Sequence, residues 1–234
     1  MIRLRMTTAR QVVENQAKLA AASGVHLILV RPMSRIAATI SILALVPGTT
    51  DAQLDDSHWS FSLESAYTFN VIRNPWFATF LGTYRKSDRN YNFVTEIVSA
   101  RYTVTNPGGP LFLRGNLEMS GGLVRTLIVK GPESYFRGSI LGLRYNFIQP
   151  GAKLIPYAEL RAGGGWCDSR GVSQSLQTDF TFTYFIGVGL RYDVNSRCSV
   201  TAGVLDQHLS NAWLANPDYG VDSLGVSVGI QVRY

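Results

Sequence analysis

Strict alternation of apolar residues with small or polar ones is the feature of this sequence that most limits its fold. In residues 180–192, FTFTYFIGVGLRY, every even position is aromatic or aliphatic, whereas the odd positions are mostly Thr, Gly or Arg. The C-terminal stretch 223–234, SLGVSVGIQVRY, repeats the pattern. Successive side chains of a strand point to opposite faces, so this period of two predicts β-strands with one apolar and one mixed face.

Segments with this alternation recur along the chain after residue 56. Their ranges are 59–71, 91–104, 111–126, 135–148, 153–166, 180–192, 197–211 and 223–234. Turn-forming sequences separate them, such as Asn-Pro-Gly-Gly at 106–109 and Gln-Pro-Gly at 149–151. We interpret residues 76–86 as an extension of the first hairpin rather than as a ninth spanning strand. The sequence therefore predicts an all-β protein with eight antiparallel strands.

The mixed face of several segments carries charged residues. These are Glu64, Arg101, Arg114, Glu118, Arg144, Glu159, Arg161 and Arg191, all predicted at mid-strand. In a soluble barrel or sandwich this face would meet water, whereas in an outer-membrane barrel it fills the lumen with ion pairs and the apolar face meets lipid. Segments of about 12–15 residues, aromatic residues near their ends and the terminal Tyr234 favour a transmembrane β-barrel. With eight strands the lumen should be filled by side chains, without an open pore.

The first 52 residues lack the alternation and are excluded from the barrel. Residues 33–52 combine one Arg, an apolar run and a Thr-Asp-Ala cleavage site at 50–52, which together are typical of a signal peptide. A buried N-terminal helix is the alternative. Residues 1–32 fit neither pattern, and we interpret them as an extension upstream of the true start. The barrel is then expected to comprise residues 53–234.

The net charge of +6 does not predict nucleic-acid binding, because the charge is unevenly distributed. The first 52 residues hold six of the 22 basic residues and two of the 16 acidic ones, which leaves the remainder at +2. The sequence also lacks a basic helical stripe with interleaved stacking aromatics. Nucleic acid is therefore not an expected partner.

Near the C-terminus, a His and a Ser two residues apart end an apolar stripe. The even positions of 197–211 run from Cys198 through three aliphatic residues to Asp206, His208 and Ser210. With both termini in the periplasm, this polar end of the lipid-facing stripe lies in the outer leaflet. Asp222 is also an even position, so it faces the same side of the wall in the next segment. Its carboxylate could reach the imidazole because adjacent strands lie about 4.8 Å apart. A His oriented by a carboxylate activates a Ser hydroxyl, and Asp206 is a rival for the orienting role.

The string HLSNAWLANPDYGVDS at 208–223 resembles the active-site segment of the lipid A 3-O-deacylase family, which are eight-stranded outer-membrane serine esterases. Family members have His-x-Ser-Asn near the end of the seventh strand and an acidic residue fourteen positions after the His, and GSILGLRYNFIQPG at 138–151 also looks like them. The resemblance covers about residues 57–234. It implies hydrolysis of the 3-O-acyl ester of lipid A, with Ser210 as nucleophile, His208 as general base and Asp222 as the residue that orients it.

The resemblance also implies partners and a location. The expected partners are lipopolysaccharide as substrate and the surrounding outer-membrane lipids, with a homodimer as a further option. No metal or cofactor is required by this chemistry. The expected location is the bacterial outer membrane.

Several positions near the motif depart from the family pattern. Asn211 and N–H groups of the following loop are expected to hold the site and the oxyanion. The family often has Pro-Asn and then Gly before the acid, with the Asn as a candidate oxyanion donor. Here Pro217 precedes Asp218, whose carboxylate would repel an oxyanion unless it is protonated or turned away, and Asn216 could replace the missing donor. Trp213 stands where a small residue is usual, and the acid is Asp rather than Glu.

Two other functions fit part of the pattern. A non-catalytic small barrel with a structural or surface-interaction role would use the polar residues of its rim only to meet lipid headgroups. A barrel that binds a hydrophobic ligand would need a larger apolar lumen, and the charged inner face argues against it.

Overall fold

A computed structural model of the protein describes residues 58–70, 85–86, 90–172, 176–216 and 219–234. The predicted upstream extension (1–32) and signal peptide (33–52) lie outside these residues. Within the described part of the chain, no helix is both long enough and apolar enough to cross a membrane.

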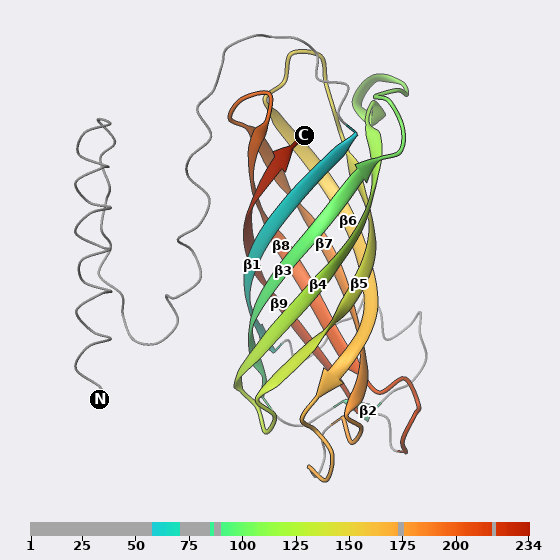
Figure 1. Ribbon diagram of the computed structural model, residues 1–234, viewed down its shortest axis with the longest axis vertical. Helices are drawn as coiled ribbons and strands as arrows, with labels where there is room; N and C mark the ends of the chain where they lie inside the picture. The colour runs from blue at the N-terminus through green and yellow to red at the C-terminus, as the bar shows by residue number, and fades with distance from the viewer. Residues whose placement is uncertain (1–57, 71–84, 87–89, 173–175, 217–218) are drawn as a thin grey trace, which may run out of the picture. The chain divides into compact units, whose positions relative to one another are not determined.

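The eight long strands of the described residues form one closed antiparallel barrel (Figure 1). They are β1 (Trp59–Asn70), β3 (Asn92–Thr103), β4 (Asn116–Lys130), β5 (Tyr135–Asn146), β6 (Leu154–Cys167), β7 (Phe180–Asp193), β8 (Cys198–Ser210) and β9 (Tyr219–Arg233). Each pairs with the next long strand along the chain, and β1 pairs with β9 to close the barrel. The prediction of eight antiparallel strands is confirmed.

One strand begins later than predicted. The segment predicted at 111–126 begins with a 3₁₀ turn, η1 (Leu111–Leu113), and β4 starts only after it. The residue before the turn is Pro110, whose carbonyl accepts a hydrogen bond from the Leu113 N–H at 3.0 Å. Arg114 therefore lies in a loop rather than at mid-strand, and its guanidinium donates to the carbonyl oxygen of Ile148 at 2.8 Å.

The segment 76–86 is described only at its end. Arg85 and Lys86 form the two-residue strand β2 (Arg85–Lys86), which runs parallel to the first residues of β9. The rest of the predicted hairpin extension lies outside the described residues.

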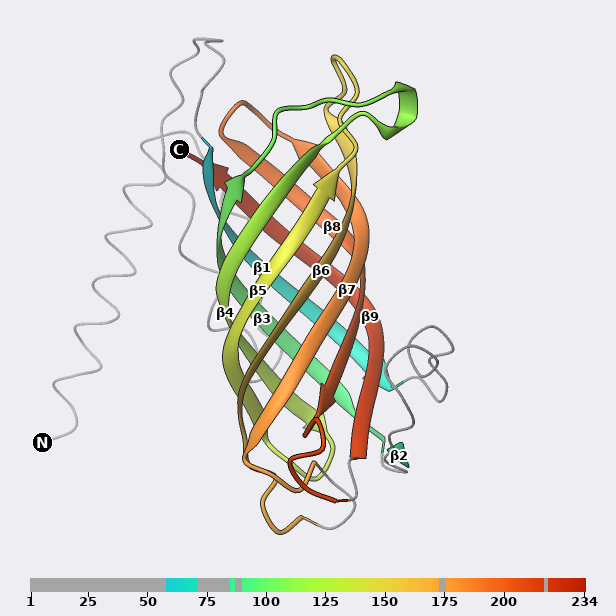
Figure 2. The same ribbon diagram turned by 90° about the vertical axis from the view of Figure 1, so that its right-hand side faces the viewer.

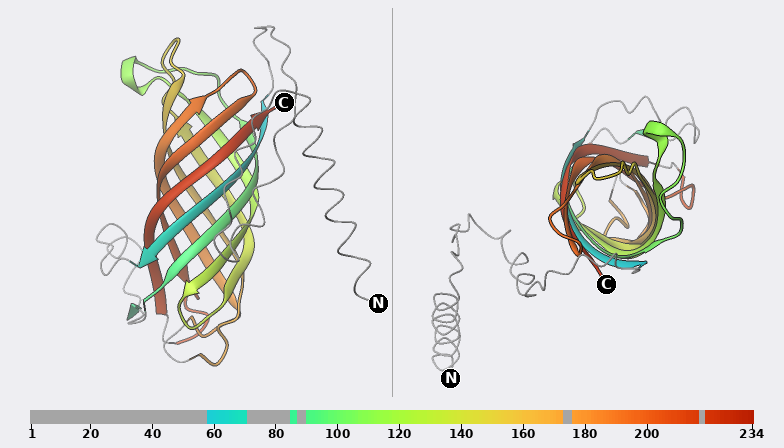
Figure 3. Two further views of the ribbon diagram at one scale, coloured as in Figure 1. Left: turned by 90° about the vertical axis from the view of Figure 1, so that its left-hand side faces the viewer. Right: turned by 90° about the horizontal axis from the view of Figure 1, so that it is seen from above.

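The barrel wall is apolar outside and polar inside, the reverse of a soluble protein. The strands surround a single lumen when the barrel is viewed along its length (Figure 3). In β7, Thr181, Thr183 and Arg191 face the lumen and are buried, whereas the even positions from Phe180 to Tyr192 face outward. This is the arrangement predicted from the alternating pattern, and it matches a wall that meets lipid.

Three arginines and two glutamates fill the lumen near mid-strand. Arg161 contacts both acids, with its Nη2 2.6 Å from Oε2 of Glu64 and also close to Glu159. Arg101 lies 2.7 Å from Glu64, and Arg144 lies 2.8 Å from Glu159. All five side chains are buried. Each buried charge thus has an opposite charge in contact, which offsets the cost of removing it from water.

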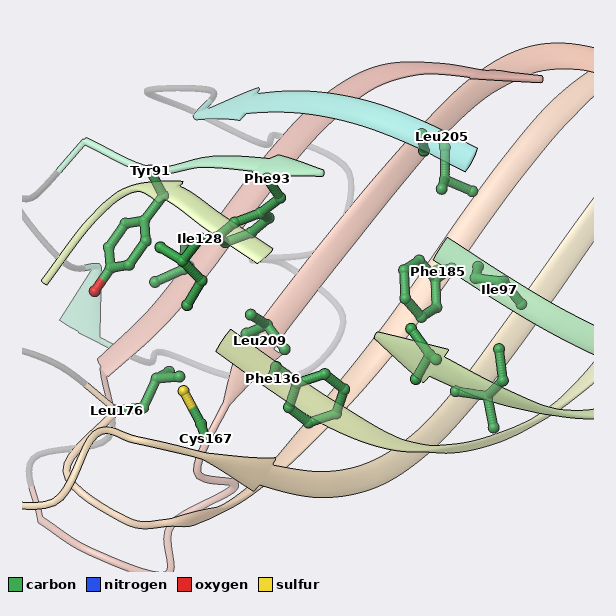
Figure 4. Packing of buried hydrophobic residues seen from close by; sticks show 14 residues of the cluster. Tyr91, Phe93, Ile97, Ile128, Phe136, Cys167, Leu176, Phe185, Leu205 and Leu209 are labelled. Carbon is green, nitrogen blue, oxygen red and sulfur yellow. The ribbon is translucent and has the colours of Figure 1, made fainter. Parts of the chain in front are cut away.

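The two ends of the barrel differ. We call the end where β1 begins and β9 finishes the terminus end, and the opposite end the distal end. At the terminus end, η1 projects to one side of the barrel (Figure 2). At the distal end apolar side chains pack inside the lumen, and Figure 4 shows Leu176, from the β6–β7 connection, beside Cys167. The long β6–β7 connection is therefore anchored by burial of its own apolar residue.

Replacing Arg161 with Met should lower the free energy of unfolding by about 3–5 kcal/mol, because it removes one of three cations from a buried cluster and leaves two carboxylates with only two. The matched control is Arg170→Met, since the Arg170–Asp179 pair at 3.1 Å is largely exposed and should contribute about 0–1 kcal/mol. Urea unfolding in phospholipid vesicles, followed by gel mobility, measures both. Equal losses for the two variants would contradict a structural role for the lumen cluster.

Candidate active site on the outer wall

Polar residues gather on the outer wall of β7, β8 and β9 near the distal end. Strand pairing aligns Tyr184 with His208, and His208 with Asp222, so the three residues form one row across adjacent strands. The next outward row toward the distal end holds Phe182 and Ser210. The structure therefore brings His208, Ser210 and Asp222 to one face of the wall.

His208 is restrained from two sides. Its Nδ1 lies 2.7 Å from Oδ1 of Asp222, and the ring of Tyr184 stacks on the imidazole with centroids 4.6 Å apart and planes 13° from parallel. His208 is only 6% exposed and Asp222 only 1%, although both lie on the outer wall. The bond at Nδ1 fixes the ring and directs Nε2 away from the carboxylate. Asp206 lies one outward position nearer the middle of β8, opposite Leu224 of β9.

Ser210 and His208 line the same groove on the outer wall. Its volume is about 760 Å³, within the range of about 300–1,000 Å³ usual for small-molecule sites. Small residues of β6 leave space between aromatic side chains, so the groove suits an apolar chain. The lining residues are Ser139, Ala162, Gly163, Gly164, Trp166, Phe180, Phe182, Thr183, Tyr184, His208, Ser210, Ala212 and Trp213.

Buried hydrogen bonds inside the barrel hold the strands that carry this site. The hydroxyl of Thr183 donates to the carbonyl oxygen of His208 at 2.9 Å. Gln207 accepts from the Thr95 hydroxyl at 2.8 Å, and its carbonyl accepts from Ser223 at 3.2 Å. The lumen side of β8 is thus tied to β3, β7 and β9, and this fixes the backbone from which His208 and Ser210 project.

Asn211 connects two distal loops. It is fully buried, and its Nδ2 donates to the carbonyl oxygens of Leu176 at 2.9 Å and Ala215 at 3.4 Å. Its Oδ1 accepts the N–H of Trp213 at 2.9 Å. Ala212 and Trp213 both have positive φ, at 48° and 67°, a conformation that costs free energy in residues other than glycine. The Asn211 side chain therefore holds a strained turn directly after Ser210.

The structure describes only some of the other loop residues that the sequence analysis named. Trp213 lines the groove and is 62% exposed, so it is available to the lipid interface. Asn216 is exposed at the end of the described part of the loop. Pro217 and Asp218 lie outside the described residues. Among the described residues, no group of three or more His, Cys, Asp or Glu side chains could hold a metal ion.

Sequence reasoning missed two parts of this site. From the sequence, Tyr184 is only one of the aromatic residues near strand ends, because its stacking on His208 depends on the β7–β8 register. The alternating pattern places Ala162 and Gly164 on the outward face of β6 but does not mark them as part of a site. Two small residues at successive outward positions were the available signal for a groove.

Comparison with known proteins gives a family match and several similar folds. The sequence profile of the family described as lipid A 3-O-deacylase (PagL) matches residues 98–231. No curated protein sequence matches the chain. Neisserial surface protein A (NspA) is similar in structure, with a TM-score of 0.52 and 17% identity, over 76% of this chain and 98% of that one. This likeness shows a shared fold.

Two further solved structures are more distant. The outer membrane enzyme PagL has a TM-score of 0.49 and 18% identity, over 71% of this chain and 97% of its own. The N-terminal β-barrel domain of Pseudomonas aeruginosa OprF has a TM-score of 0.42 and 13% identity, over 76% and 98% of the two chains.

Replacing Asn211 with Ala should loosen both distal loops, because it leaves buried carbonyl and N–H groups without their partner, at about 1–3 kcal/mol. Hydrogen exchange at 168–172 and 211–216 should then quicken while the strands stay protected. The control is Asn195→Ala, since Asn195 accepts from the N–H groups of Arg197 and Cys198 in a turn at the terminus end. Unchanged exchange in the distal loops of Asn211→Ala would show that Asn211 does not hold them.

Proposed function

This chain belongs to the lipid A 3-O-deacylase (PagL) family, and we propose that it hydrolyses the 3-O-linked acyl ester of lipid A by serine esterase chemistry at Ser210. His208 acts as the general base and Asp222 orients it. The substrate is lipopolysaccharide in the membrane that surrounds the barrel.

The protein is a β-barrel of the bacterial outer membrane. In such barrels an even number of strands brings both termini to the periplasmic side. The terminus end therefore faces the periplasm, and the distal end faces the outside of the cell. The groove then opens at the level of the outer leaflet, which contains lipopolysaccharide.

The observation that carries the proposal is the contact of 2.7 Å between His208 Nδ1 and Asp222 Oδ1 in the groove that Ser210 also lines. A carboxylate at Nδ1 stabilises the imidazolium and leaves Nε2 to exchange a proton with the serine. His208 and Ser210 are two positions apart, about 6.7 Å along the strand, so imidazole and hydroxyl extend from neighbouring outward positions. Stacked Tyr184 keeps the imidazole ring from turning out of this arrangement.

The reaction follows in two halves. Oγ of Ser210 attacks the acyl carbonyl carbon while Nε2 of His208 takes the hydroxyl proton. The tetrahedral intermediate breaks its bond to the 3-oxygen of the sugar, which receives that proton, and the acyl group stays on Ser210. Water, deprotonated by His208, then attacks the acyl-serine, releases the fatty acid and restores the hydroxyl.

The oxyanion needs hydrogen-bond donors from the β8–β9 loop. The N–H of Trp213 already donates to Asn211, which makes that amide a support of the turn. Asn216 is the side-chain donor that we propose in place of the usual family Asn. The role of Asn211 in this proposal is to hold the loop that presents these groups.

The alternative is a non-catalytic barrel with a structural or surface-interaction role. The fold it shares with neisserial surface protein A is compatible with it, but a shared fold carries no activity. The two functions differ in what they do to lipid A, so a chemical readout separates them.

Cells that express the wild-type protein should contain lipid A that lacks one hydroxyacyl chain, whereas the Ser210→Ala variant should leave lipid A intact. Mass spectrometry of extracted lipid A measures the difference. Ser139→Ala is the matched control, because it removes another hydroxyl that lines the same groove and should behave like wild type. Intact lipid A in cells with folded, membrane-inserted wild-type protein would favour the non-catalytic alternative.

The identity of the orienting acid can be tested separately. Asp222→Asn should lower kcat by about 10²–10⁴-fold. The variant removes the carboxylate that stabilises the imidazolium and that holds the neutral imidazole in the tautomer needed for catalysis. Asp206→Asn should retain most activity in the same assay of initial rates on purified lipid A. The reverse result would assign the orienting role to Asp206.

A further inference from the structure

Two arginines stand side by side on the lipid-facing wall beside the groove. Arg125 of β4 and Arg137 of β5 are direct partners in the strand register. Both face outward and are exposed, because the lumen side of β5 is formed by the even positions such as Phe136 and Ile140. An arginine on the lipid face costs about 2–4 kcal/mol at the bilayer midplane but only about 0–1 kcal/mol near the interface, so this pair fits the interfacial end of the wall.

The two arginines differ in their partners. Arg125 lies 3.4 Å from Glu96, in a pair whose side chains are 47% and 29% exposed. Arg137 has no carboxylate partner within the described part of the chain, and its guanidinium lies over the ring of Tyr135, 4.7 Å from the centroid. Asp168 also lies at this end of the wall, but its carboxylate accepts the N–H groups of Ser134 and Tyr135. Arg137 is therefore the arginine of this pair that forms no ion pair among the described residues.

Arg137 adjoins the groove. Arg137 is two residues from Ser139 on the same outward face, and it pairs with Trp166 of β6. Ser139 and Trp166 both line the groove that contains Ser210. Tyr135 is the first residue of β5, on the distal side of Arg137, so stacking draws the guanidinium toward the distal end. That is the level of the lipid headgroups.

The distance between Arg137 and Ser210 suits a substrate of one kind. Three strand spacings separate β5 from β8, a distance of about 14 Å around the wall, which is comparable with the length of a disaccharide. Lipid A is a phosphorylated disaccharide with ester-linked acyl chains. A molecule with its ester at Ser210 could therefore place a phosphate against β5.

We propose that Arg137, assisted by Arg125, forms an anion subsite that binds a phosphate group of the lipid A headgroup beside the groove. The planar guanidinium matches phosphate geometry and can donate two parallel hydrogen bonds. The subsite rests on the proposed function, and it makes the enzyme selective for phosphorylated glycolipid. Arg125 is shared between Glu96 and the phosphate, so Arg137 contributes most of the binding free energy for the phosphate.

The test compares kcat/KM on bisphosphorylated lipid A with kcat/KM on the same lipid after phosphatase treatment. Arg137→Gln should reduce the ratio of the two values about ten-fold, through KM on the phosphorylated lipid, as expected for loss of a hydrogen bond to a charged group. The control is Arg197→Gln, which removes the same charge from an exposed turn at the terminus end and should leave the ratio unchanged. Heat-modifiable gel mobility confirms that each barrel is folded.

The outcomes separate the two proposals. No hydrolysis of either lipid by the wild-type protein would overturn the esterase function itself. If both lipids are hydrolysed and the ratio of the two kcat/KM values is the same in wild type and Arg137→Gln, the phosphate subsite is wrong while the esterase function stands. Inhibition of the wild type by inorganic phosphate at the concentration of the lipid would assign the site to free phosphate rather than to a headgroup.

Discussion

The ion cluster in the lumen is the interaction on which the rest of this structure depends. Glu64 and Glu159 accept from Arg101, Arg144 and Arg161 in a buried part of the lumen, and such contacts form only when all the contributing strands are closed into a barrel. Charged residues fill the middle of the lumen and further apolar residues fill its distal end, while the lipid-facing positions of the strands are largely apolar. The outer wall must then meet lipid, and any site on that wall faces the membrane rather than water.

This constraint explains the unusual position of the catalytic candidates. His208 and Asp222 are buried although they lie on the outer wall, because Tyr184 and the pairing strands cover them. Hydrogen bonds from the lumen side, such as that of Thr183 to the His208 carbonyl, hold the strand backbone from behind. A substrate that is itself a lipid could reach such a site by lateral diffusion, without leaving the bilayer.

Much of the fold could be predicted because alternation is a local property. Each strand shows its apolar face in its own sequence, and this was enough to obtain the number of long strands and the lumen location of Arg144, Glu159 and Arg161. The prediction failed at 111–115, where the local hydrogen bonds of η1 replace those of a strand ladder. Hydrophobicity alone does not distinguish an apolar turn from the start of an apolar strand.

The sequence by itself determined which face each candidate residue occupies. His208 and Ser210 share a face because they are two positions apart in a strand, and Asp222 is an even number of positions from the outward residues Leu224 and Val226. Only the tertiary structure decided which of these residues meet. The register of β8 against β9 places Asp222 opposite His208, and the registers of β4 to β7 bring Arg125 beside Arg137 and open a groove next to them. Register is set by closure of the whole barrel and by packing in its lumen, so no single segment of the sequence contains it.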